Sequence, residues 1–374
     1  MKITGLTVYP VQPRWLFLKV ETDEGITGWG EPSLEGQARA VIGALKDMEE
    51  RVIGADPTKI ERLWQILYRG AFYRGGPVTM SAISGIEHAC WDILGKSLGV
   101  PVHALLGGAV RDRIRMYCWV GGDTTDALIE SARAAMARGY TAVKTTPVGP
   151  TDLIDGADVV NQAAERMGAL RAAVGDGLDI GLDMHGRLSP AMSIQVIDAL
   201  KEMRPFFVEE PVLPESVGGL VRVARAVTTP IATGERVFTK WGFRDIIEQE
   251  AAAIVQPDLC HCGGIWEGRK IAAHAETRFI ALAPHNPLGP ISTAACLQLD
   301  AATPNFLVQE HATQGLGDDG HLREPFVLGA DGTLPVGQKP GLGIEVDEEY
   351  VKAHPFESWI NPLYDASDGF ITEW

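Results

Sequence analysis

Six side chains of the kinds that bind metals or move protons recur at regular intervals through the second half of the sequence. Each follows a short apolar run, and successive members are 23 to 27 residues apart. A single carboxylate after a strand is usually a helix cap or a solvated loop residue, but six in register are hard to explain in that way. The six residues are Asp183, Glu209, Glu235, Asp258, His285 and Glu310.

The first three of these residues are carboxylates, and their chemistry points to a metal. Asp183, Glu209 and Glu235 would raise one another's pKa if they converged without a cation between them. Donor sets made only of oxygen select hard cations, and Mg²⁺ with water or substrate in its remaining positions fits such a set. Glu210 is adjacent to Glu209, and side chains alternate along a strand. The residues themselves therefore leave open which of these two glutamates faces the metal.

Two histidines could flank a bound substrate. His185 lies two residues beyond Asp183, so an extended backbone would point both side chains to the same side. His285 follows the seventh apolar run, which lies opposite the third in a ring of eight strands. A catalytic histidine needs a partner that fixes its tautomer and tunes its pKa, and Asp258 is placed to do this for His285.

Short apolar runs that alternate with amphipathic helical stretches must position these residues. Strands that alternate with helices predict parallel βαβ units, and eight such units predict a closed (β/α)8-type TIM barrel. The carboxyl ends of its strands meet on one face, where the active sites of such barrels lie. The predicted strands are Ile114–Val120, Ala142–Lys144, Asp179–Asp183, Phe206–Glu209, Ile231–Ala232, Ala253–Val255, Phe279–Ala283 and Phe306–Val308.

The first part of the chain has a different pattern of apolar residues. Residues 2–30 resemble strands joined by turns, and apolar residues then recur at helical spacing over Gln37–Ile53, Thr58–Tyr68 and Thr79–Leu98. This pattern predicts an α+β domain over residues 1–115. Residues 116–325 form the predicted barrel domain, and residues 326–374 break the alternation and are expected to pack back on the first domain.

Composition excludes several classes of function. The 374 residues include 33 Lys and Arg against 49 Asp and Glu, which gives a formal net charge of −16 at pH 7. Such an acidic chain is not expected to bind nucleic acid or an anionic membrane. Five cysteines in a chain of this length do not indicate a disulfide framework. The first residues lack the pattern of a signal peptide, and no apolar run could span a bilayer, so we expect a cytoplasmic protein.

Two weaker motifs predict structure rather than chemistry. Cys260, His261 and Cys262 would suit zinc, but no second Cys/His pair follows at a suitable spacing. Glu87, His88 and Asp92 fall on one helical stretch that is otherwise apolar. We interpret both groups as structural.

Beyond these single residues, the order of the barrel residues resembles the enolase superfamily, and the Asp–His pair on strands six and seven resembles its mandelate racemase subgroup. Several longer stretches are similar to the bacterial galactonate dehydratases of that subgroup over nearly the whole chain. These stretches are Pro13–Trp15, Phe72–Pro77, Trp119–Asp123, Gly181–Arg187 and Leu282–Pro290.

The resemblance implies a role for each barrel residue. It implies that the first domain and the C-terminal tail together form a capping domain, and that Mg²⁺ binds Asp183, Glu209 and Glu235, which favours Glu209 over Glu210. It also implies that His285, oriented by Asp258, is the base and that His185 is the acid. Glu310 would hydrogen-bond the substrate carboxylate, and Lys144 would help to neutralise it.

The capping domain is expected to supply specificity for a small sugar acid. Four of its residues lie on loops bounded by Gly or Pro and offer hydrogen-bond donors or an apolar wall to a polyol. They are Arg14, Trp15, Tyr73 and Arg74. The resemblance also implies a homo-oligomer.

The stretch after the second barrel strand departs from the family pattern. Racemases of the subgroup carry Lys-x-Lys there, whereas this chain has Lys144, Thr145 and Thr146. Galactonate dehydratases carry Asn where this chain has Thr146, and the segment Pro147–Pro150 also differs. The missing lysine disfavours racemase and cycloisomerase reactions that need a lysine base on that face.

The expected reaction is elimination of water from D-galactonate, in which His285 removes the C2 proton and His185 protonates the departing 3-hydroxyl. The alternatives are a dehydratase for another sugar acid such as D-gluconate, a racemase or epimerase of the subgroup, a sugar-acid binding protein, and a metal-dependent sugar isomerase.

Overall fold

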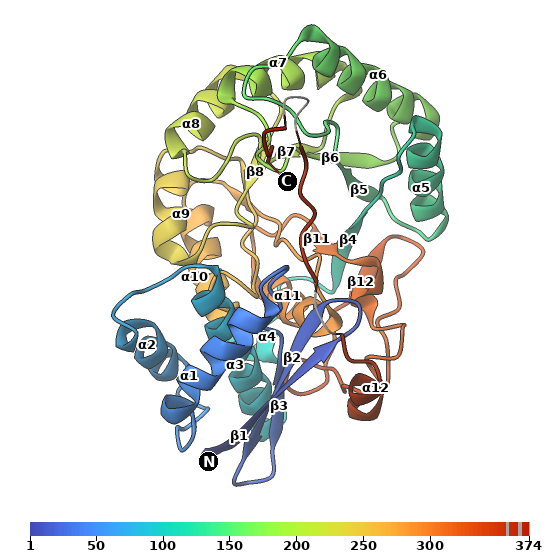
Figure 1. Cartoon of the computed structure of the whole chain (residues 1–374). Helices are drawn as coiled ribbons and strands as arrows, with labels where there is room; N and C mark the ends of the chain where they lie inside the picture. Colours follow the sequence, from blue (N-terminus) through green and yellow to red (C-terminus); the bar gives the residue numbers. More distant parts are fainter. Residues whose placement is uncertain (357–358, 366–368, 374) are drawn as a thin grey trace.

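A ring of parallel strands surrounded by helices makes up the larger part of the chain. The computed structural model describes residues 1–356, 359–365 and 369–373. The N-terminal strands and helices lie together against one side of the ring, as the blue segments of Figure 1 show. The chain therefore has a barrel part and an N-terminal part that are in contact.

Eight strands form the ring, in the order β10-β9-β8-β7-β6-β5-β4-β11, and every neighbouring pair is parallel. A parallel bridge from Leu282 to Phe306, and a hydrogen bond from the Leu307 amide to the Leu282 carbonyl, join the last two strands and close the barrel. The strands are β4 Arg113–Trp119, β5 Ala142–Thr145, β6 Asp179–Asp183, β7 Phe207–Glu209, β8 Ile231–Thr233, β9 Ile254–Val255, β10 Ala281–Leu282 and β11 Gln309–His311.

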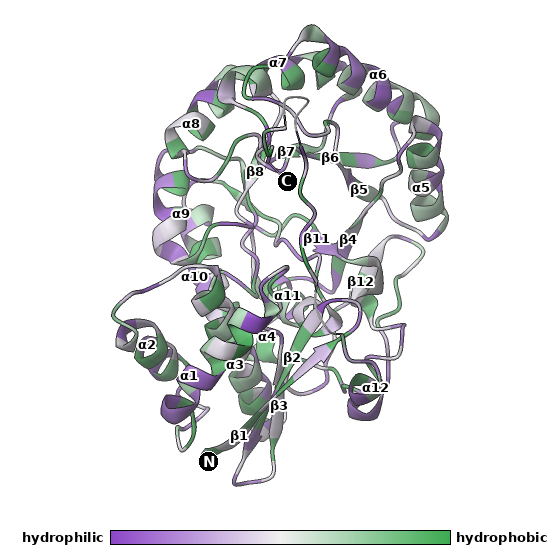
Figure 2. Ribbon diagram, in the orientation of Figure 1, coloured by the Kyte–Doolittle hydropathy of each residue, from purple (hydrophilic) through white to green (hydrophobic). Residues whose placement is uncertain are grey.

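Helices connect successive strands and cover the outside of the barrel. Most of them are amphipathic, so purple and green alternate around the ring in Figure 2, whereas the last one is buried on every side. Several begin at a serine or threonine cap, as at Thr124, Ser189 and Ser216. The helices are α5 Thr125–Ala137, α6 Ala157–Val174, α7 Pro190–Leu200, η1 Lys201–Met203, α8 Val217–Ala226, α9 Thr239–Glu248, α10 Ile265–Glu276 and α11 Pro290–Ala302.

Apolar side chains from the strands fill the interior of the barrel. Tyr117 and Phe207 meet edge to face with ring centroids 6.0 Å apart. Small residues such as Ala142 and Ala232 complete this cluster. Because the interior is packed at this level, polar groups on the strands can gather only at the strand ends.

The N-terminal part is a three-stranded antiparallel sheet against helices. Strand β3 approaches α3 so closely that a Cβ at Gly30 would collide with the Gly85 carbonyl oxygen. Helix α3 is buried on almost every side and ends at Gly99, which adopts a left-handed conformation with φ 70°. The elements are β1 Ile3–Val11, β2 Trp15–Thr22, β3 Thr27–Gly30, α1 Ala38–Val52, α2 Ile60–Gly70, α3 Pro77–Leu98 and α4 Val102–Leu105.

Two predicted strands differ most from the observed ones, and five others differ by one residue at one end or at both. Phe279 was expected to begin a strand, but it lies in a turn after α10 with φ 56° and is fully exposed. The eighth strand was expected to end at Val308, whereas ladder pairing with β4 runs over Gln309–His311. Glu310 therefore lies inside the strand rather than after it, because polar residues continue the hydrogen bonding beyond the apolar run.

The chain after β11 leaves the regular βα pattern. The short helix η2 Thr313–Leu316 follows, and β12 Thr333–Pro335 then pairs with β4 in the antiparallel sense. Helix α12 Glu348–Ala353 packs on the N-terminal sheet, where the Tyr9 hydroxyl donates to Glu348 over 2.8 Å. The tail therefore contacts the barrel through β12 and the N-terminal part through α12.

The last part of the chain extends across the side of the barrel that holds the strand ends. Arg14 stacks on the Trp359 ring at 5.0 Å, and Arg187 stacks on Tyr364 at 5.8 Å. These contacts join the N-terminal part to the loop after β6, consistent with the dark red trace in Figure 1.

Two buried carboxylates of the N-terminal part meet the N-termini of barrel helices. Glu31 accepts hydrogen bonds from the Gly289 and Ser292 amides at the start of α11, over 2.7 and 2.9 Å. Glu87 accepts from the Ile265 and Trp266 amides at the start of α10, over 2.8 and 2.9 Å. Both carboxylates satisfy amides that a helix cannot pair internally.

His88 on α3 gives the contact between the two parts a pH dependence. Its Nε2 donates to the Leu259 carbonyl over 3.0 Å, and burial lowers its pKa to about 4. The unfolded chain binds this proton more readily, so the free energy of unfolding should fall by about 2 kcal/mol between pH 7 and pH 5. His88→Gln keeps a donor but cannot titrate. Urea unfolding at both pH values should show a smaller fall in the variant, and an equal fall would contradict the prediction.

Among the described residues, the structure contains no helix that is both long enough and apolar enough to cross a membrane.

Candidate active site

The carboxyl ends of the barrel strands and two residues of the N-terminal part enclose a cavity of about 340 Å³. Its lining combines carboxylates, histidines and a lysine from β5, β6 and β11 and from the loops after β8 and β10. The lining residues are Arg14, Glu35, Trp119, Lys144, Asp183, His185, Glu235, His285, Pro287, Glu310, His311 and Ala312.

Lys144 lies at the centre of the carboxylates. Its Nζ is 2.9 Å from Glu209 Oε1, 2.9 Å from Glu310 Oε1 and 3.3 Å from Asp183 Oδ2. Burial alone would lower the pKa of Lys144, but Glu209, Glu310 and Asp183 together hold it well above its usual range. The lysine is therefore charged and shares its charge among three acids.

Neighbouring strands bring these acids together. Asp183 ends β6 and pairs in register with Glu209, which ends β7. Glu209 faces Lys144, whereas Glu210 has φ 38° and forms an ion pair with Arg236. The change of backbone direction at Glu210 thus separates the two neighbours, because Glu209 reaches the carboxylate cluster and Glu210 reaches Arg236.

The cluster carries more negative than positive charge. Asp183, Glu209, Glu235 and Glu310 are four carboxylates around the single Lys144 ammonium. Burial raises the pKa of Glu209 to about 8. A carboxylate whose charged form is disfavoured in this way is stabilised as an anion when a cation binds it. Oxygen donors and a charge deficit are the properties of a hard divalent cation site, so these residues fit such an ion.

The possible ligand atoms that lie closest together do not come from the same three residues that the sequence predicted as metal ligands. Among the described residues, one ligand atom each from Glu209, Glu235 and His285 lie within 4.8 Å of one another. Asp183, which the sequence placed with Glu209 and Glu235, is held instead by Lys144 and by His185. The Lys144 ammonium lies between Asp183 and Glu209, where a metal cation would neutralise the same two carboxylates.

His285 is held between two acids. Its Nδ1 donates to Asp258 Oδ2 over 2.8 Å. Its Nε2 is 2.9 Å from Glu235 Oε2 and 4.0 Å from Glu310 Oε2. Burial alone would lower the pKa of His285, but Glu235 and Glu310 hold it well above its usual range. The ion pair with His285 also outweighs burial at Glu235 and lowers the pKa of that carboxyl.

His185 lies on the same cavity. It follows β6 with φ 50°, its amide donates to Asp183 Oδ1 over 2.9 Å, and its Nε2 is 3.2 Å from Asp183 Oδ2. Burial lowers the pKa of His185, and the Asp183 carboxylate opposes this only in part. The two histidines thus have pKa values shifted in opposite directions.

These pKa shifts are the reverse of what the expected roles require. A base such as His285 must start neutral, and an acid such as His185 must start charged. The reason for the reversal is the negative charge of Glu235 beside His285. A cation on Glu235 would cancel that charge and lower the pKa of His285 toward the range of a base.

The structure brings most of the predicted residues to one place. Seven of them line the cavity, and Glu209 and Asp258 are buried directly beneath it in contact with Lys144 and His285. The seven are Arg14, Lys144, Asp183, His185, Glu235, His285 and Glu310.

Three predicted substrate residues lie elsewhere. None of Trp15, Tyr73 and Arg74 is among the described residues that line the cavity. Trp15 is 1% exposed and stacks on Phe17, because it begins β2 and points into the core. Tyr73 is 85% exposed on a loop, and Arg74 lies over the Tyr68 ring.

The sequence interpretation missed several residues at the site, and two of these contact predicted residues directly. Gln256 follows β9 and donates to Glu209 Oε2 over 2.8 Å, and its place after a strand was a signal that could have been used. Glu35 forms an ion pair with Arg14 on the cavity wall. That pairing depends on how the N-terminal part docks, so no local pattern indicates it.

A second cavity of about 420 Å³ adjoins the first and shares Trp119 with it. Its wall includes Thr145, Thr146 and the segment Pro147–Pro150, together with Arg166 and Arg187. The stretch that departs from the family pattern therefore lies next to the site.

Replacing Lys144 should couple stability to divalent cations. Lys144→Met leaves three buried carboxylates without their partner, so we expect a loss of about 3–5 kcal/mol in the free energy of unfolding under EDTA. Excess Mg²⁺ should reduce the loss, because a ligand that binds the folded state stabilises it. Thermal unfolding with and without Mg²⁺ measures this. Lys19→Met, which breaks an ion pair with Glu348, is the control and should not respond to Mg²⁺. A loss at Lys144 that Mg²⁺ leaves unchanged would contradict the prediction.

Comparison with known proteins places this site in a family. Residues 7–107 match the mandelate racemase / muconate lactonizing enzyme N-terminal domain, and residues 127–350 match the enolase C-terminal domain-like family. The chain is 47% identical to the D-galactonate dehydratase of Ralstonia nicotianae and 46% identical to that of Xanthomonas euvesicatoria, over 100% of both chains in each case.

Solved structures agree with this assignment. An enolase from Agrobacterium radiobacter with bound sodium and L-malate superposes with a TM-score of 0.92 at 31% identity, over 100% of both chains. A mandelate racemase/muconate lactonizing enzyme-like protein from Roseovarius superposes with a TM-score of 0.91 at 36% identity, over 98% of this chain and 99% of that one. The chain belongs to the mandelate racemase and muconate lactonizing enzyme family of the enolase superfamily.

Proposed function

We propose that this protein is a Mg²⁺-dependent dehydratase that eliminates water from D-galactonate to give 2-dehydro-3-deoxy-D-galactonate. The observation that carries the proposal is the acid–base and carboxylate set around one cavity, in a chain 47% identical over its full length to a D-galactonate dehydratase. A site for binding alone would not need His185 and His285 on the same cavity as Lys144.

Asp183, Glu209 and Glu235 are the residues we propose to hold Mg²⁺. Bound there, the ion would supply positive charge that stabilises the negative charge developing on the substrate carboxylate. Gln256 would hold Glu209 in place through its 2.8 Å hydrogen bond. The sodium and L-malate in the Agrobacterium relative support a cation and a hydroxy acid as occupants of such a site.

His285 would remove the C2 proton with Nε2, the nitrogen that faces the cavity. Its Nδ1–H is committed to Asp258, so the neutral ring carries its lone pair on Nε2. Breaking the C2–H bond leaves an electron pair that is first delocalised into the substrate carboxylate as an enediolate. In a second step this pair forms the C2–C3 double bond as the C3–O bond breaks. His185 would give its proton to the departing hydroxyl, which leaves as water, and the enol product then becomes the 2-keto acid.

Lys144, Glu310 and Arg14 would bind the substrate. Lys144 would release one of its three carboxylate partners and attract the substrate carboxylate. Glu310, which accepts from the Asn286 amide over 3.1 Å, would hydrogen-bond the same group. Arg14 would donate to hydroxyls of the sugar chain from the cavity wall.

The remaining expectations stay part of the proposal. We propose that residues 1–115 and 326–374 act as a capping domain on a barrel of residues 116–325. The family resemblance favours a homo-oligomer. Five buried thiols with no disulfide are compatible with a reducing compartment, and we propose the cytoplasm.

A screen of stereoisomeric sugar acids with Mg²⁺, read as 2-keto acid, tests the proposal. The expected result is a single hit on D-galactonate that EDTA removes. A hit on another acid would overturn the substrate but keep the reaction, and Thr146→Asn would then test whether the stretch after β5 sets the preference. Loss of C2 deuterium without keto acid would indicate a racemase. Absence of both products and exchange would overturn the enzyme assignment.

A further inference from the structure

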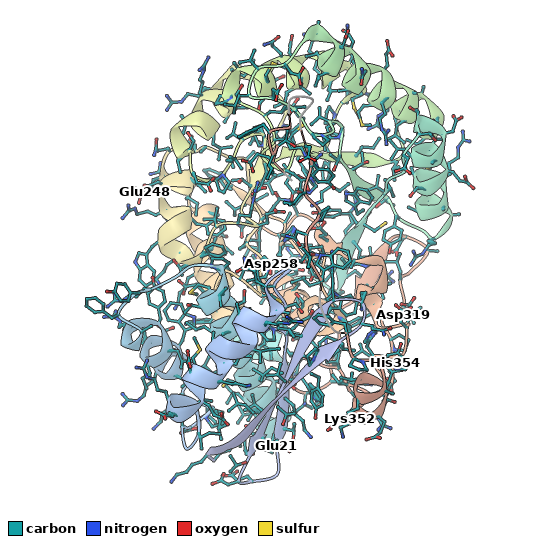
Figure 3. The ribbon with its side chains drawn as sticks, viewed as in Figure 1. Glu21, Glu248, Asp258, Asp319, Lys352 and His354 are labelled. Atoms are coloured by element: carbon teal, nitrogen blue, oxygen red, sulfur yellow. The ribbon has the colours of Figure 1, made fainter. Side chains whose placement is uncertain are left out.

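One face of helix α3 holds the loop that carries Asp258. Four of its buried side chains contact residues 259–266: Ser81 meets His261 Nδ1, Ser84 accepts from the Gly263 amide, Glu87 accepts from two amides, and His88 donates to the Leu259 carbonyl. Their spacing places them on adjacent turns of one helix face. Asp258 lies at the boundary between the barrel and the N-terminal helices in Figure 3.

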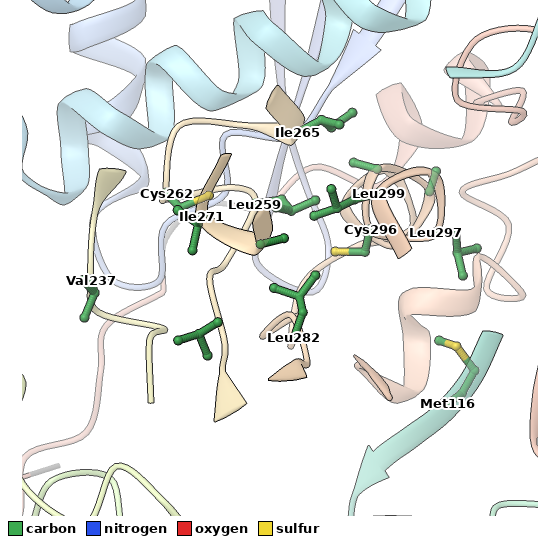
Figure 4. Close-up of a cluster of buried hydrophobic side chains, with 14 of the residues drawn as sticks. Met116, Val237, Leu259, Cys262, Ile265, Ile271, Leu282, Cys296, Leu297 and Leu299 are labelled. Carbon is green, nitrogen blue, oxygen red and sulfur yellow. The ribbon is translucent and has the colours of Figure 1, made fainter. Parts of the chain in front are cut away.

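The loop is fixed on its other side as well. Leu259 and Cys262 point into a buried apolar cluster with Cys296 and Leu299, as Figure 4 shows. At Gly264, with φ 95°, an added Cβ would collide with Glu87. The Cys260–Gly264 segment is therefore held between α3 and the barrel core, and its polar side chains have defined directions.

His261 faces the carboxylate that orients His285. Asp258 Oδ1 accepts from the Cys260 amide over 2.7 Å, and Oδ2 accepts from His285 Nδ1 over 2.8 Å. His261 Nε2 lies 3.7 Å from the same Oδ2 oxygen. Asp258 is fully buried, so a second N–H directed at it acts with little screening by water.

The contact with Ser81 favours a proton on His261 Nε2. The Ser81 hydroxyl has one proton, which it can give to the Pro77 carbonyl at 2.7 Å or to His261 Nδ1 at 2.9 Å. If the proton goes to Nδ1, the neutral ring carries its hydrogen on Nε2. If it goes to Pro77, Nδ1 must itself donate, and the neutral ring would then turn a bare Nε2 toward the Asp258 carboxylate, which is repulsive. The first arrangement is therefore favoured, and it places the Nε2–H on the side of Asp258 Oδ2.

We propose that His261, held by Ser81 of helix α3, is a positioning residue that fixes the Asp258 carboxylate and through it the base His285. The expected effect on kcat rests on the proposed function, whereas the expected effect on the positions of Asp258 and His285 does not. It gives the Cys260-His261-Cys262 motif a role other than metal binding, and it extends the polar contacts of the base into the N-terminal part. Among the described residues, the charged or titratable groups that act on His261 include Glu35 and His88, and Glu31 acts on Asp258.

The experiment compares two replacements of His261. His261→Asn can still reach Ser81 but is too short to meet Asp258, whereas His261→Gln keeps a donor at about the reach of Nε2. We expect His261→Asn to lower kcat by about 10-fold to 100-fold with a smaller change in KM, because a displaced base acts on the chemical step rather than on binding. His261→Gln should restore most of the loss.

The chain offers a matched pair of serines as a control. Ser81 and Ser84 are both fully buried on the same face of α3, and the hydroxyl of each lies within hydrogen-bond distance of the carbonyl four residues earlier. Ser84 differs from Ser81 in its partner on the loop, because it accepts from the Gly263 amide. Ser81→Ala should lower kcat in the same direction as His261→Asn, whereas Ser84→Ala should affect stability more than kcat. An equal effect of the two serines on kcat would overturn the proposal.

A proton NMR signal provides a readout that needs no substrate. The Nδ1 proton of His285, shared with Asp258, should give a downfield resonance that is absent in His285→Asn. We expect this resonance to shift or broaden in His261→Asn and Ser81→Ala, to stay in place in Ser84→Ala, and to return in His261→Gln. A folded His261→Asn with the resonance and kcat of the wild type would overturn the proposal. If the proposed function is wrong, the His285 Nδ1 resonance still shows whether or not His261 positions Asp258 and His285.

Discussion

His285→Asn is expected to lower kcat by about 10²–10⁴-fold and to abolish exchange of the C2 hydrogen of the substrate with solvent. The asparagine amide can still donate to Asp258, as His285 Nδ1 does, so the pocket keeps its shape but loses the lone pair that accepts the proton. Keto-acid formation and C2 deuterium wash-out, measured on the same samples, separate loss of the base from loss of binding.

His185→Asn is the informative control for that experiment. Because His185 would act only when the hydroxyl leaves, its loss should stop keto-acid formation while C2 exchange continues. In the structure the pKa of His285 is raised and that of His185 is lowered, which is the reverse of these roles. If His185→Asn stops exchange and His285→Asn does not, the two roles must be exchanged.

Removing divalent cations has the second largest expected effect. Chelation should reduce turnover by about 10³-fold, because a bound metal contributes several kcal/mol of charge stabilisation in such reactions. The reason lies in the site, where four carboxylates and one lysine leave excess negative charge that would repel an anionic substrate. Assays after EDTA treatment, followed by titration with Mg²⁺, measure the loss and the recovery.

Titration calorimetry of single variants tests which residues hold the ion. Asp183→Asn, Glu209→Gln and Glu235→Gln should each weaken Mg²⁺ binding. Glu210→Gln is the matched control, because Glu210 is adjacent in sequence but pairs with Arg236. Weaker binding in Glu210→Gln than in Glu209→Gln would show that the assignment of Glu209 is wrong.

The sequence predicted the barrel strands well where burial and pairing coincide. Strand β6 has the predicted bounds Asp179–Asp183, because both faces of a parallel barrel strand are covered and an aspartate bounds its apolar run at each end. The prediction failed at β11, where pairing continues through the polar residues Gln309–His311. Hydrophobicity marks burial, and the ends of hydrogen-bonded ladders need not follow it.

The residues of the N-terminal part were harder to predict. A loop bounded by Gly and Pro indicates a turn but not the direction of its side chains, so Arg14 lines the cavity while Trp15 turns into the core. The contact between Ser81 and His261 joins residues 180 positions apart. Such contacts depend on how two independently patterned parts pack together, and neither part's pattern contains that information.

The carboxylates of Glu31 and Glu87 have a consequence for how the protein could be divided. Each completes the first turn of a barrel helix from outside the barrel, at the starts of α11 and α10. A barrel expressed without residues 1–115 would begin these helices with unpaired amides, so the two parts should unfold in one cooperative transition. Exchange of specificity between relatives by grafting one N-terminal part onto another barrel would therefore need both acid-to-helix contacts to be transferred intact.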